Sequence, residues 1–354
     1  MEDKSITLPS ISHYKYCQRP SSERKENRSK SKALSTKSKA IYFSHNNKLC
    51  SPNTSQQEEN YRKSNNHKIK SELNSKFPNL SSNIWGVFNG SNGEILFGKN
   101  YNTRREIASL TKIMTCFTVI QLSKALNIDM KSENIVISKR ASLIIGTKAE
   151  LEKGDKLSVY DLLFGLMLPS GNDAAIALTE HFSRLIYLKL YPNNPTFPNQ
   201  ISKFFIYEMN KIASLIGMKR TTFSNSHGLA DNLNKSTVCD LGILASNAMK
   251  DAIFKIIVST KSYTAIGSDI LGDKKEFEWR NRNILLEFGF NGIKTGSTTT
   301  AGHCLCSSIE SDNKLIIIVL LNAKTEKARF SETRKIVKYI IYNNFLDPIQ
   351  KIYS

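Results

Sequence analysis

Three short groups of residues could together form a serine-based acyl-transfer site. In chain order they are Ser109-Leu110-Thr111-Lys112, Ser170-Gly171-Asn172 and Lys294-Thr295-Gly296. A serine hydroxyl becomes a good nucleophile only when a neighbouring base takes its proton. Residues three apart on a helix share one face, with Cβ atoms about 5–6 Å apart, so the Lys112 amine can reach the Ser109 hydroxyl. This spacing predicts Ser109 as the nucleophile and Lys112 as its general base.

A lysine can act as a base near neutral pH only if its pKa is lowered. For Lys112 the required shift is about 3 units, or roughly 4 kcal/mol. Burial provides part of this shift, and a second cation nearby disfavours the charged ammonium form. Lys294 is the cation that we expect to act on Lys112. The start of a helix at Ser109 would also place backbone N–H groups and the helix dipole near a developing oxyanion.

The Ser-x-x-Lys spacing is not specific by itself. It also occurs at Ser22 to Lys25 and at Ser29 to Lys32, within a polar stretch. Ser109 differs because it begins a run with apolar residues near the helical period and because the other two groups follow downstream. The combination in this order, rather than any one group, indicates a catalytic site.

The chain divides by composition at about residue 80. Residues 1–80 are rich in Ser, Asn and Lys and hold 16 Lys or Arg against 7 Asp or Glu. Such a segment has too little apolar surface to offset the entropy of ordering, so we expect a disordered basic extension over 1–80. Residues 81–350 carry the apolar patterns and are expected to form the catalytic domain.

Composition also limits the partners. The net charge is +19, but much of the excess lies in the extension, and no nucleic-acid-binding motif accompanies it, so we expect no nucleic-acid partner. No apolar run has the length of a signal peptide or a transmembrane helix, which leaves the compartment cytoplasmic or unknown. The six cysteines lack metal-ligand or disulfide spacing. We therefore expect free thiols, no metal and no cofactor.

Periodicity predicts an α/β domain with three layers. A hairpin is expected over 84–97, helices from 109 to about 126, from 158 to 168 and after 172, and a last helix from 327 to 344. Strands are expected at 283–290, 301–309 and 314–321. Strands at both ends of the domain with helices between them predict one antiparallel sheet, in which the first and last segments meet, with helices on both faces and a helical lobe.

Over about residues 84–346 the chain resembles the low-molecular-mass penicillin-binding proteins, the D-alanyl-D-alanine carboxypeptidases of peptidase family S11. The resemblance rests on the three groups above and on further short matches in the same order. These matches are the hairpin 87–100, Ala108 to Thr115, Gly165 to Ala175, Ser226 to Leu229, Asn281 to Asn283, Gly292 to Thr298, Ala301-Gly302 and Ala328 to Phe330.

The resemblance implies a DD-peptidase or β-lactamase-like fold and a serine-type D-Ala-D-Ala carboxypeptidase that is covalently inhibited by β-lactams. It implies that Ser170 relays protons and that Asn172 holds the substrate amide. The strand with Lys294, Thr295, Gly296, Ser297 and Thr298 would line the opposite wall of the cleft, and the N–H groups of Ser109 and Ser297 would bind the oxyanion. Arg329 would hold the terminal carboxylate of the substrate, a peptide ending in D-Ala-D-Ala. We expect a monomer, and an insertion over 185–200.

Three other functions remain open from the sequence. A β-lactamase of the same fold would need a deacylating carboxylate in a Glu-x-x-Leu-Asn context, and no glutamate between the second and third groups has it. Slow loss of a penicilloyl group is therefore expected. A related serine peptidase or esterase could act on an acyl substrate outside peptidoglycan, which would suit a chain without an export signal. A catalytically silent binding or scaffold protein is disfavoured by the intact reactive residues.

Overall fold

The computed structural model describes residues 77–194, 196–311 and 313–343. All of them except Phe77 belong to a compact unit that begins at Pro78. Nearly all of the expected extension over 1–80 lies outside the described residues, and so does the end of the expected domain, 344–350. Both boundaries stay predictions.

The core is a five-stranded antiparallel sheet in the order β2-β1-β11-β10-β9. The first and last strands of the domain meet, since Ile84 pairs with Leu321 and Asn89 with Ile316. This confirms the expected pairing of the two ends of the chain. The strands of this sheet are β1 (Ile84–Asn89), β2 (Ile95–Lys99), β9 (Ile293–Thr298), β10 (Gly302–Ser311) and β11 (Lys314–Ala323).

Strand β11 shows that the sheet lies inside the domain, covered on both faces. Its residues from Ile316 to Leu321 are all buried. A strand that is apolar on both faces needs cover on both faces, as the continuous apolar run in the sequence indicates. The β1–β2 hairpin is also confirmed, and its turn closes where the N–H of Gly93 donates to the carbonyl of Asn89.

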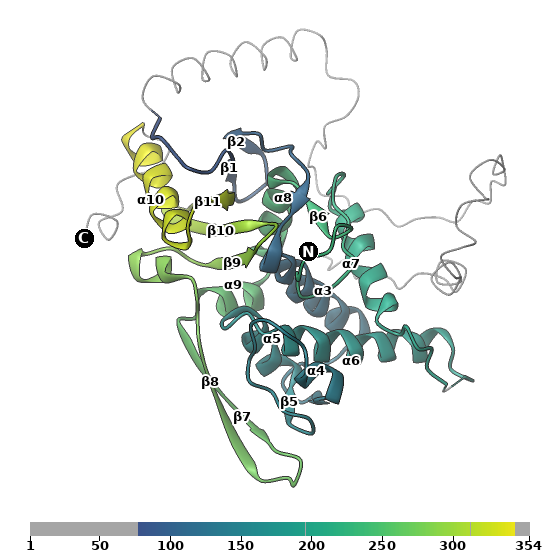
Figure 1. Ribbon diagram of the computed structural model, residues 1–354. Coiled ribbons are helices and arrows are strands. Elements are labelled where there is room, and N and C mark those ends of the chain that lie inside the picture. Colours follow the sequence, from purple (N-terminus) through teal and green to yellow (C-terminus); the bar gives the residue numbers. More distant parts are fainter. Residues whose placement is uncertain (1–76, 195, 312, 344–354) are drawn as a thin grey trace, which may run out of the picture. The chain divides into compact units, whose positions relative to one another are not determined.

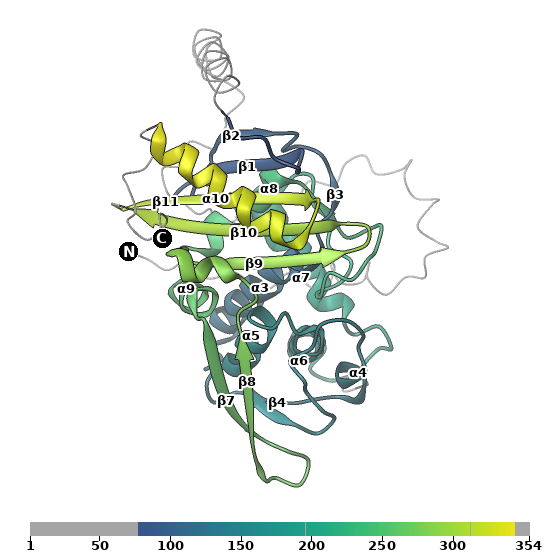
Figure 2. The same ribbon diagram turned by 60° about the vertical axis from the view of Figure 1, so that its left-hand side comes forward.

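Helices cover both faces of the sheet (Figures 1 and 2). Helix α10 lies on one face, while α3, α8 and α9 lie on the other, next to a lobe formed by α4, α5, α6 and α7. This is the expected three-layer α/β/α arrangement. The helices are η3 (Ala108–Leu110), α3 (Thr111–Leu126), α4 (Lys139–Ser142), α5 (Val159–Met167), α6 (Asn172–Leu190), α7 (Lys203–Leu215), α8 (Val238–Ala248), α9 (Ala252–Ser259), η4 (Ile284–Phe288) and α10 (Glu326–Tyr342).

Helix α3 runs through the centre of the domain. Side chains on all of its sides are buried, including Ile113, Phe117 and Ile120. A helix that is apolar all round must lie between other elements rather than on a surface. Its buried position fixes the N-terminal end, where the Ser109 to Lys112 group lies, between the sheet and the helical lobe.

The prediction of a strand over 283–290 was wrong. These residues form the short 3₁₀ helix η4, which begins where the Asn283 side chain accepts the N–H of Leu285 and ends at Gly289 in the left-handed region (φ 82°). Short apolar runs fit a buried helical turn as well as a strand, and here the cap and the glycine decide between them. The strand that follows is β9, which starts at Ile293.

Two smaller sheets accompany the main sheet. A four-stranded sheet in the order β4-β5-β7-β8 carries a long β7–β8 hairpin, which projects away from the rest of the domain (Figures 1 and 2). The sequence analysis did not predict this hairpin. The strands are β3 (Arg105–Glu106), β4 (Asn134–Val136), β5 (Lys156–Ser158), β6 (Lys235–Ser236), β7 (Ser262–Ser268) and β8 (Lys274–Arg280), with β3 pairing with β6.

Two further expectations concern cysteines and membranes. The four cysteines within the described ranges, Cys116, Cys239, Cys304 and Cys306, are free thiols, as predicted. Among the helices of the described ranges, none combines the length and the apolar composition that crossing a bilayer requires.

Candidate active site

Ser109 and Lys112 lie at the junction of η3 and α3. Ser109 is part of the 3₁₀ turn that precedes α3, and Lys112 is in the first turn of α3. The Lys112 Nζ is 3.1 Å from the Ser109 Oγ. Ala108, directly before the serine, has a φ of 49°, an uncommon conformation for a residue with a side chain. The chain therefore makes a sharp bend that leaves the Ser109 hydroxyl partly exposed.

The Lys112 side chain is fully buried and held by three oxygen atoms. Besides the serine hydroxyl, its Nζ lies 2.7 Å from the Asn172 Oδ1 and 2.6 Å from the His227 carbonyl. A neutral amine has two N–H donors and one lone pair. If Lys112 is neutral, its two N–H groups donate to the Asn172 Oδ1 and the His227 carbonyl, and its lone pair is left to accept the proton of Ser109. The geometry is therefore suited to a neutral lysine that accepts a proton.

The pKa of Lys112 is lowered from 10.5 to about 7, mainly by burial, against the opposing effect of the Asp173 carboxylate and with a smaller contribution from the exposed Arg282 guanidinium. Removal of the ammonium from water is therefore the main cause. Arg282 is thus a further cation that acts on Lys112, and the two lysines also interact, because the charge of Lys112 helps to lower the pKa of Lys294. No sequence pattern indicated this effect of Arg282.

The second group forms the turn between α5 and α6. Ser170 has a φ of 70°, and its carbonyl accepts the hydroxyl of Thr147. The buried Ser170 Oγ has no hydrogen-bond partner among the described residues. A buried hydroxyl without a partner is uncommon and is available to a substrate or to a proton in transit.

Asn172 links Lys112 to the loop that precedes α5, and its expected contact with a substrate amide stays a prediction. Its Oδ1 accepts from Lys112, and its Nδ2 donates to the carbonyl of Ile145 at 2.7 Å. Both ends of the amide are thus engaged, so Asn172 orients the lysine. Asp173 holds the same segment, since its carboxylate accepts the N–H groups of Ala149 and Leu151.

Strand β9 forms the facing wall. Glycine at position 296 lets β9 pack close to Ser109, because a Cβ at this position would lie 2.9 Å from the backbone nitrogen of Ser109. Lys294 is 1% exposed, and its Nζ donates to the carbonyl of Thr295. Burial, followed by the charges of Lys112, Arg282 and Arg329, lowers its pKa well below the ordinary value. Thr295 is buried, whereas Ser297 and Thr298 lie at the open end of the strand.

Arg329 comes from α10, behind this wall. Its Nη1 donates to the carbonyl of Gly296 at 3.1 Å, and its Nη2 pairs with Glu326 at 2.5 Å. The side chain is only 3% exposed, while Glu326 is 60% exposed. Arg329 therefore supports β9 from behind and places a positive charge near Lys294.

His227 contributes through its backbone. Its carbonyl accepts from Lys112, while its Nδ1 accepts the N–H of Leu229. Burial and the charges of Lys112 and Arg140 lower the pKa of the imidazole to about 4, so the ring is neutral near pH 7. Gly228 is required here, since it has a φ of 85° and a Cβ would lie 2.1 Å from the carbonyl oxygen of Ala108.

Comparison with known proteins agrees with this geometry. A family model described as D-alanyl-D-alanine carboxypeptidase, peptidase family S11, matches residues 71–184 and 201–325. The chain belongs to peptidase family S11. The family match omits 185–200, the same residues that the sequence predicts to be an insertion. In the structure their first part continues α6 to Leu190, and the Tyr187 hydroxyl then donates to the carbonyl of Thr196.

Individual relatives are similar to this chain over about three quarters of its length. The D-alanyl-D-alanine carboxypeptidase of Streptomyces sp. (strain K15) is 36% identical over 72% of this chain and 84% of its own length. The D-alanyl-D-alanine carboxypeptidase DacF of Bacillus subtilis (strain 168) is 30% identical over 73% of this chain and 62% of its own length. The crystal structure of the Streptomyces K15 DD-transpeptidase superposes with a TM-score of 0.68 at 34% identity, covering 75% of this chain and 98% of that one.

Two residues of this S11 site escaped the sequence analysis. Arg282 acts electrostatically on both lysines, and Asp173 secures the second group. Arg282 lies in the short Asn281 to Asn283 match, so the signal was present, but its position near both lysines comes from the turn that follows β8, where its backbone N–H donates to the carbonyl of Leu168. Asp173 lies next to Asn172, yet its partners are more than 20 residues away in sequence.

Proposed function

We propose that this S11 chain is a serine-type D-Ala-D-Ala carboxypeptidase that reacts through an acyl-enzyme. The observation that supports it best is the fully buried Lys112, with a pKa of about 7 and with Ser109 as the one hydroxyl among its three partners. The names of the relatives agree with this activity.

In the proposed acylation, neutral Lys112 takes the proton of Ser109 while the serine oxygen attacks the carbonyl carbon of the penultimate D-Ala. The N–H groups of Ser109 and Ser297 stabilise the oxyanion. The proton then passes through the Ser170 hydroxyl, which has no other partner among the described residues, to the leaving amine. The C–N bond breaks, D-Ala departs, and the peptide remains as an ester on Ser109.

Deacylation reverses these roles. Lys112, again neutral, takes a proton from a water molecule, which attacks the ester carbonyl, and the proton returns to the Ser109 oxygen as the C–O bond breaks. Asn172 and the His227 carbonyl keep the amine in place through both half-reactions, because they hold its N–H groups without supplying protons of their own.

Recognition of the terminal carboxylate is assigned to cations around β9. Lys294 and Arg329 lie in or behind the strand, and Thr295 is part of it. Arg282 is exposed, and its charge acts on Lys112, Lys294 and Arg329. A substrate carboxylate that binds near these cations loses its hydration water, and charge-assisted hydrogen bonds to the cations compensate for that loss. Peptides ending in a free carboxylate, and β-lactams that carry one, are therefore the proposed ligands.

The experiment is mass spectrometry of the protein after incubation with a penicillin, together with release of D-Ala from a peptide ending in D-Ala-D-Ala. We expect one penicilloyl group on Ser109 and none on Ser109→Ala. Ser22 and Ser29, which begin the other Ser-x-x-Lys groups, serve as internal controls and should stay unlabelled. Labelling elsewhere, or D-Ala release by Ser109→Ala, would contradict the proposal.

A further inference from the structure

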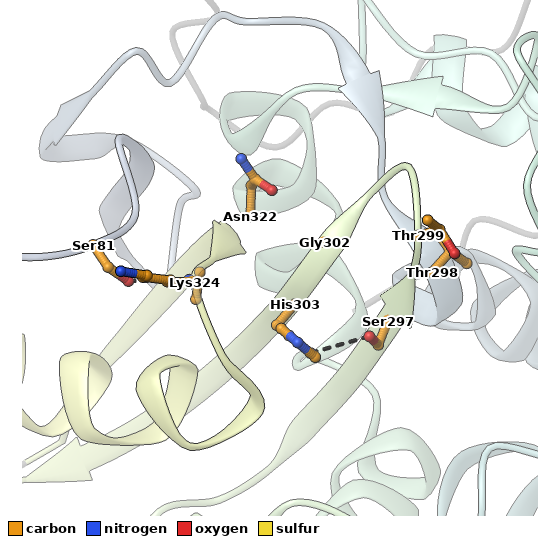
Figure 3. A pocket seen from close by; sticks show the side chains of 9 residues that line it. Ser81, Ser297, Thr298, Thr299, Gly302, His303, Asn322 and Lys324 are labelled. Atoms are coloured by element: carbon orange, nitrogen blue, oxygen red, sulfur yellow. Dashed lines mark hydrogen bonds between the residues drawn. The ribbon is translucent and has the colours of Figure 1, made fainter.

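The two walls of the proposed site are held in different ways. Strand β9 is fixed by its ladder with β10, in which Ser297 pairs with His303. On the face of the sheet away from Ser109, the Ser297 Oγ is 3.0 Å from the His303 Nδ1, beside a pocket of about 590 Å³ (Figure 3). The opposite wall depends on residues 145–151, which lie between α4 and β5 and form neither a helix nor a strand. This segment therefore needs bonds to other elements to keep one conformation.

Segment 145–151 bonds to the turn that carries Ser170. The Thr147 hydroxyl donates to the Ser170 carbonyl at 2.6 Å, and the Thr147 carbonyl accepts the N–H of Asn172. Ser170 has a φ of 70°, which a residue with a side chain rarely adopts and which surrounding contacts must maintain. Because Thr147 bonds to both sides of this turn, segment 145–151 holds the backbone from which the Ser170 hydroxyl projects.

Ala149 is the point where this segment is joined to the β7–β8 hairpin. Its N–H donates to the Asp173 carboxylate, and its carbonyl accepts the indole N–H of Trp279 at 2.9 Å. Trp279 lies on β8 and is only 4% exposed. Within the described ranges, no second donor reaches the Ala149 carbonyl. A buried carbonyl without a donor is rare in folded proteins, so the indole bond is a strong constraint on segment 145–151.

Two glycines allow close packing around this bond. A Cβ at Gly165 would lie 3.1 Å from the Trp279 ring, and a Cβ at Gly171 would lie 2.9 Å from the Ala149 side chain. Gly171 directly follows Ser170 in the chain. A displacement of Ala149 would therefore meet the main chain next to Ser170, because little free space separates them.

The indole is itself fixed to the helical lobe. Tyr263 of β7 pairs with Trp279, and its hydroxyl donates to the Asp161 Oδ1 at 2.6 Å. The Tyr263 ring also stacks on Phe164, with the ring centroids 3.7 Å apart. Since Asp161 and Phe164 both belong to α5, the base of the hairpin is anchored on a helix. Trp279 thus offers a rigid donor to the Ala149 carbonyl.

We propose that Trp279 is a positioning residue for proton transfer at Ser170. It acts through the Ala149 carbonyl and segment 145–151, not by contact with the reacting atoms. The inference rests on the proposed acyl-enzyme function, in which the Ser170 hydroxyl passes a proton to the leaving amine. Without the indole N–H, segment 145–151 gains freedom, and the Ser170 hydroxyl spends less time aligned with that amine. The β9 wall keeps its ladder, so substrate binding is unchanged.

The test compares two substrates whose leaving groups differ in their need for a proton. A peptide ending in D-Ala-D-Ala expels an amine, which must be protonated, whereas the same peptide with sulfur in place of the scissile N–H expels a thiolate, which leaves without a proton. Acylation rates are measured in single turnovers over a range of concentrations. For Trp279→Phe we expect the maximal rate with the amide to fall about three- to tenfold, the size of one hydrogen bond, at an unchanged half-saturating concentration. The loss with the thioester should stay within about twofold.

Tyr263→Phe is the matched control, because it removes a hydrogen bond from the same hairpin to α5 rather than to Ala149, and it should acylate at the wild-type rate. Thr147→Val, which removes the hydroxyl bonded to the Ser170 carbonyl, should reproduce the pattern of Trp279→Phe, and Thr147→Ser should restore wild-type rates. The double variant with Trp279→Phe and Thr147→Val should lose less than the product of the two single losses, since both act through one segment.

Thermal melting establishes that the variants fold. If Trp279→Phe does not fold, benzothienylalanine at position 279, which has the shape of tryptophan with sulfur in place of the N–H, takes its place in the test. A wild-type rate with the amide, equal losses with amide and thioester, or a loss confined to the half-saturating concentration would overturn the role of Trp279 while leaving the acyl-enzyme intact. Absence of any acyl group on Ser109 of the wild type would instead mark failure of the proposed function, and the role of Trp279 would fall with it.

Discussion

Two buried lysines face each other across the proposed site, and their surroundings differ. On the helical wall, Lys112 is held by an amide, a carbonyl and a serine hydroxyl. On the sheet wall, Lys294 has one hydrogen-bond partner among the described residues, the carbonyl of Thr295. A lysine with all positions occupied is organised to exchange a proton, whereas one with unused donors is organised to receive an anion. We therefore propose proton transfer for Lys112 and substrate binding for Lys294.

Lys112→Arg tests this division most severely. Arginine keeps the charge but does not lose a proton at accessible pH, so acylation of Ser109 by penicillin should fall about 10²–10⁴-fold. Gel labelling or stopped-flow kinetics measures the rate, and Lys112→Met, of similar length and uncharged, is the control for packing. Thermal melting confirms that both variants fold. An Arg variant within about tenfold of wild type would make Lys112 an electrostatic group rather than the base.

The pH dependence follows from the lowered pKa of Lys112. The neutral amine is the reactive form, so the acylation rate should rise with pH through about 7. Between pH 7 and pH 5 the neutral fraction drops by a factor of about fifty, and the rate should drop with it. Rates measured from pH 5 to pH 9 give the midpoint. A rate that stays flat across this range would exclude Lys112 as the titrating base.

Lys294→Gln should affect binding more than chemistry. Loss of a charged hydrogen bond to the substrate carboxylate costs about 1.5–2 kcal/mol, or roughly ten- to thirtyfold in kcat/KM. We expect most of it in KM for a peptide ending in D-Ala-D-Ala. A methyl ester of the same peptide, which lacks the carboxylate, is the matched substrate and should discriminate far less between variant and wild type. A loss confined to kcat would indicate that Lys294 takes part in proton transfer rather than in substrate binding.

Arg282→Gln should produce a smaller, diagnostic change. The Arg282 cation lowers the pKa of Lys112, so its removal should raise that pKa and move the acid limb of acylation to higher pH. At pH 6 the rate should fall about two- to fivefold. Arg280→Gln, exposed at the end of β8, is the control and should leave the limb in place. A shift to lower pH would contradict the electrostatic assignment.

Removal of residues 1–76 should have the smallest effect. The described elements that supply both lysines and their partners all begin after Pro78, so we expect acylation within about twofold of wild type. The shortened and full-length proteins are compared with one penicillin under the same conditions. A larger loss of rate would mean that the extension contributes to the site.

Much of this site could be predicted from the sequence because its chemistry is local. Ser109 and Lys112 are three residues apart, and a helix alone brings them together. The pairing of β1 with β11 followed from apolar strands at both ends of the domain. The prediction of a strand over 283–290 was wrong because the capping Asn283 and the terminating Gly289 favour a short 3₁₀ helix over the strand that the apolar pattern indicated.

The sequence by itself therefore determined the proposed nucleophile and base, the order of the three groups and the class of fold, since spacing and periodicity encode them. Tertiary structure alone decided that Asn172 accepts a hydrogen bond from Lys112, that Arg282 lies near enough to act as a cation on that lysine, and that a pocket opens beside Ser297. Burial, electrostatic distance and the face to which a side chain points depend on segments that are far apart in the chain. These quantities exist only after the chain has folded.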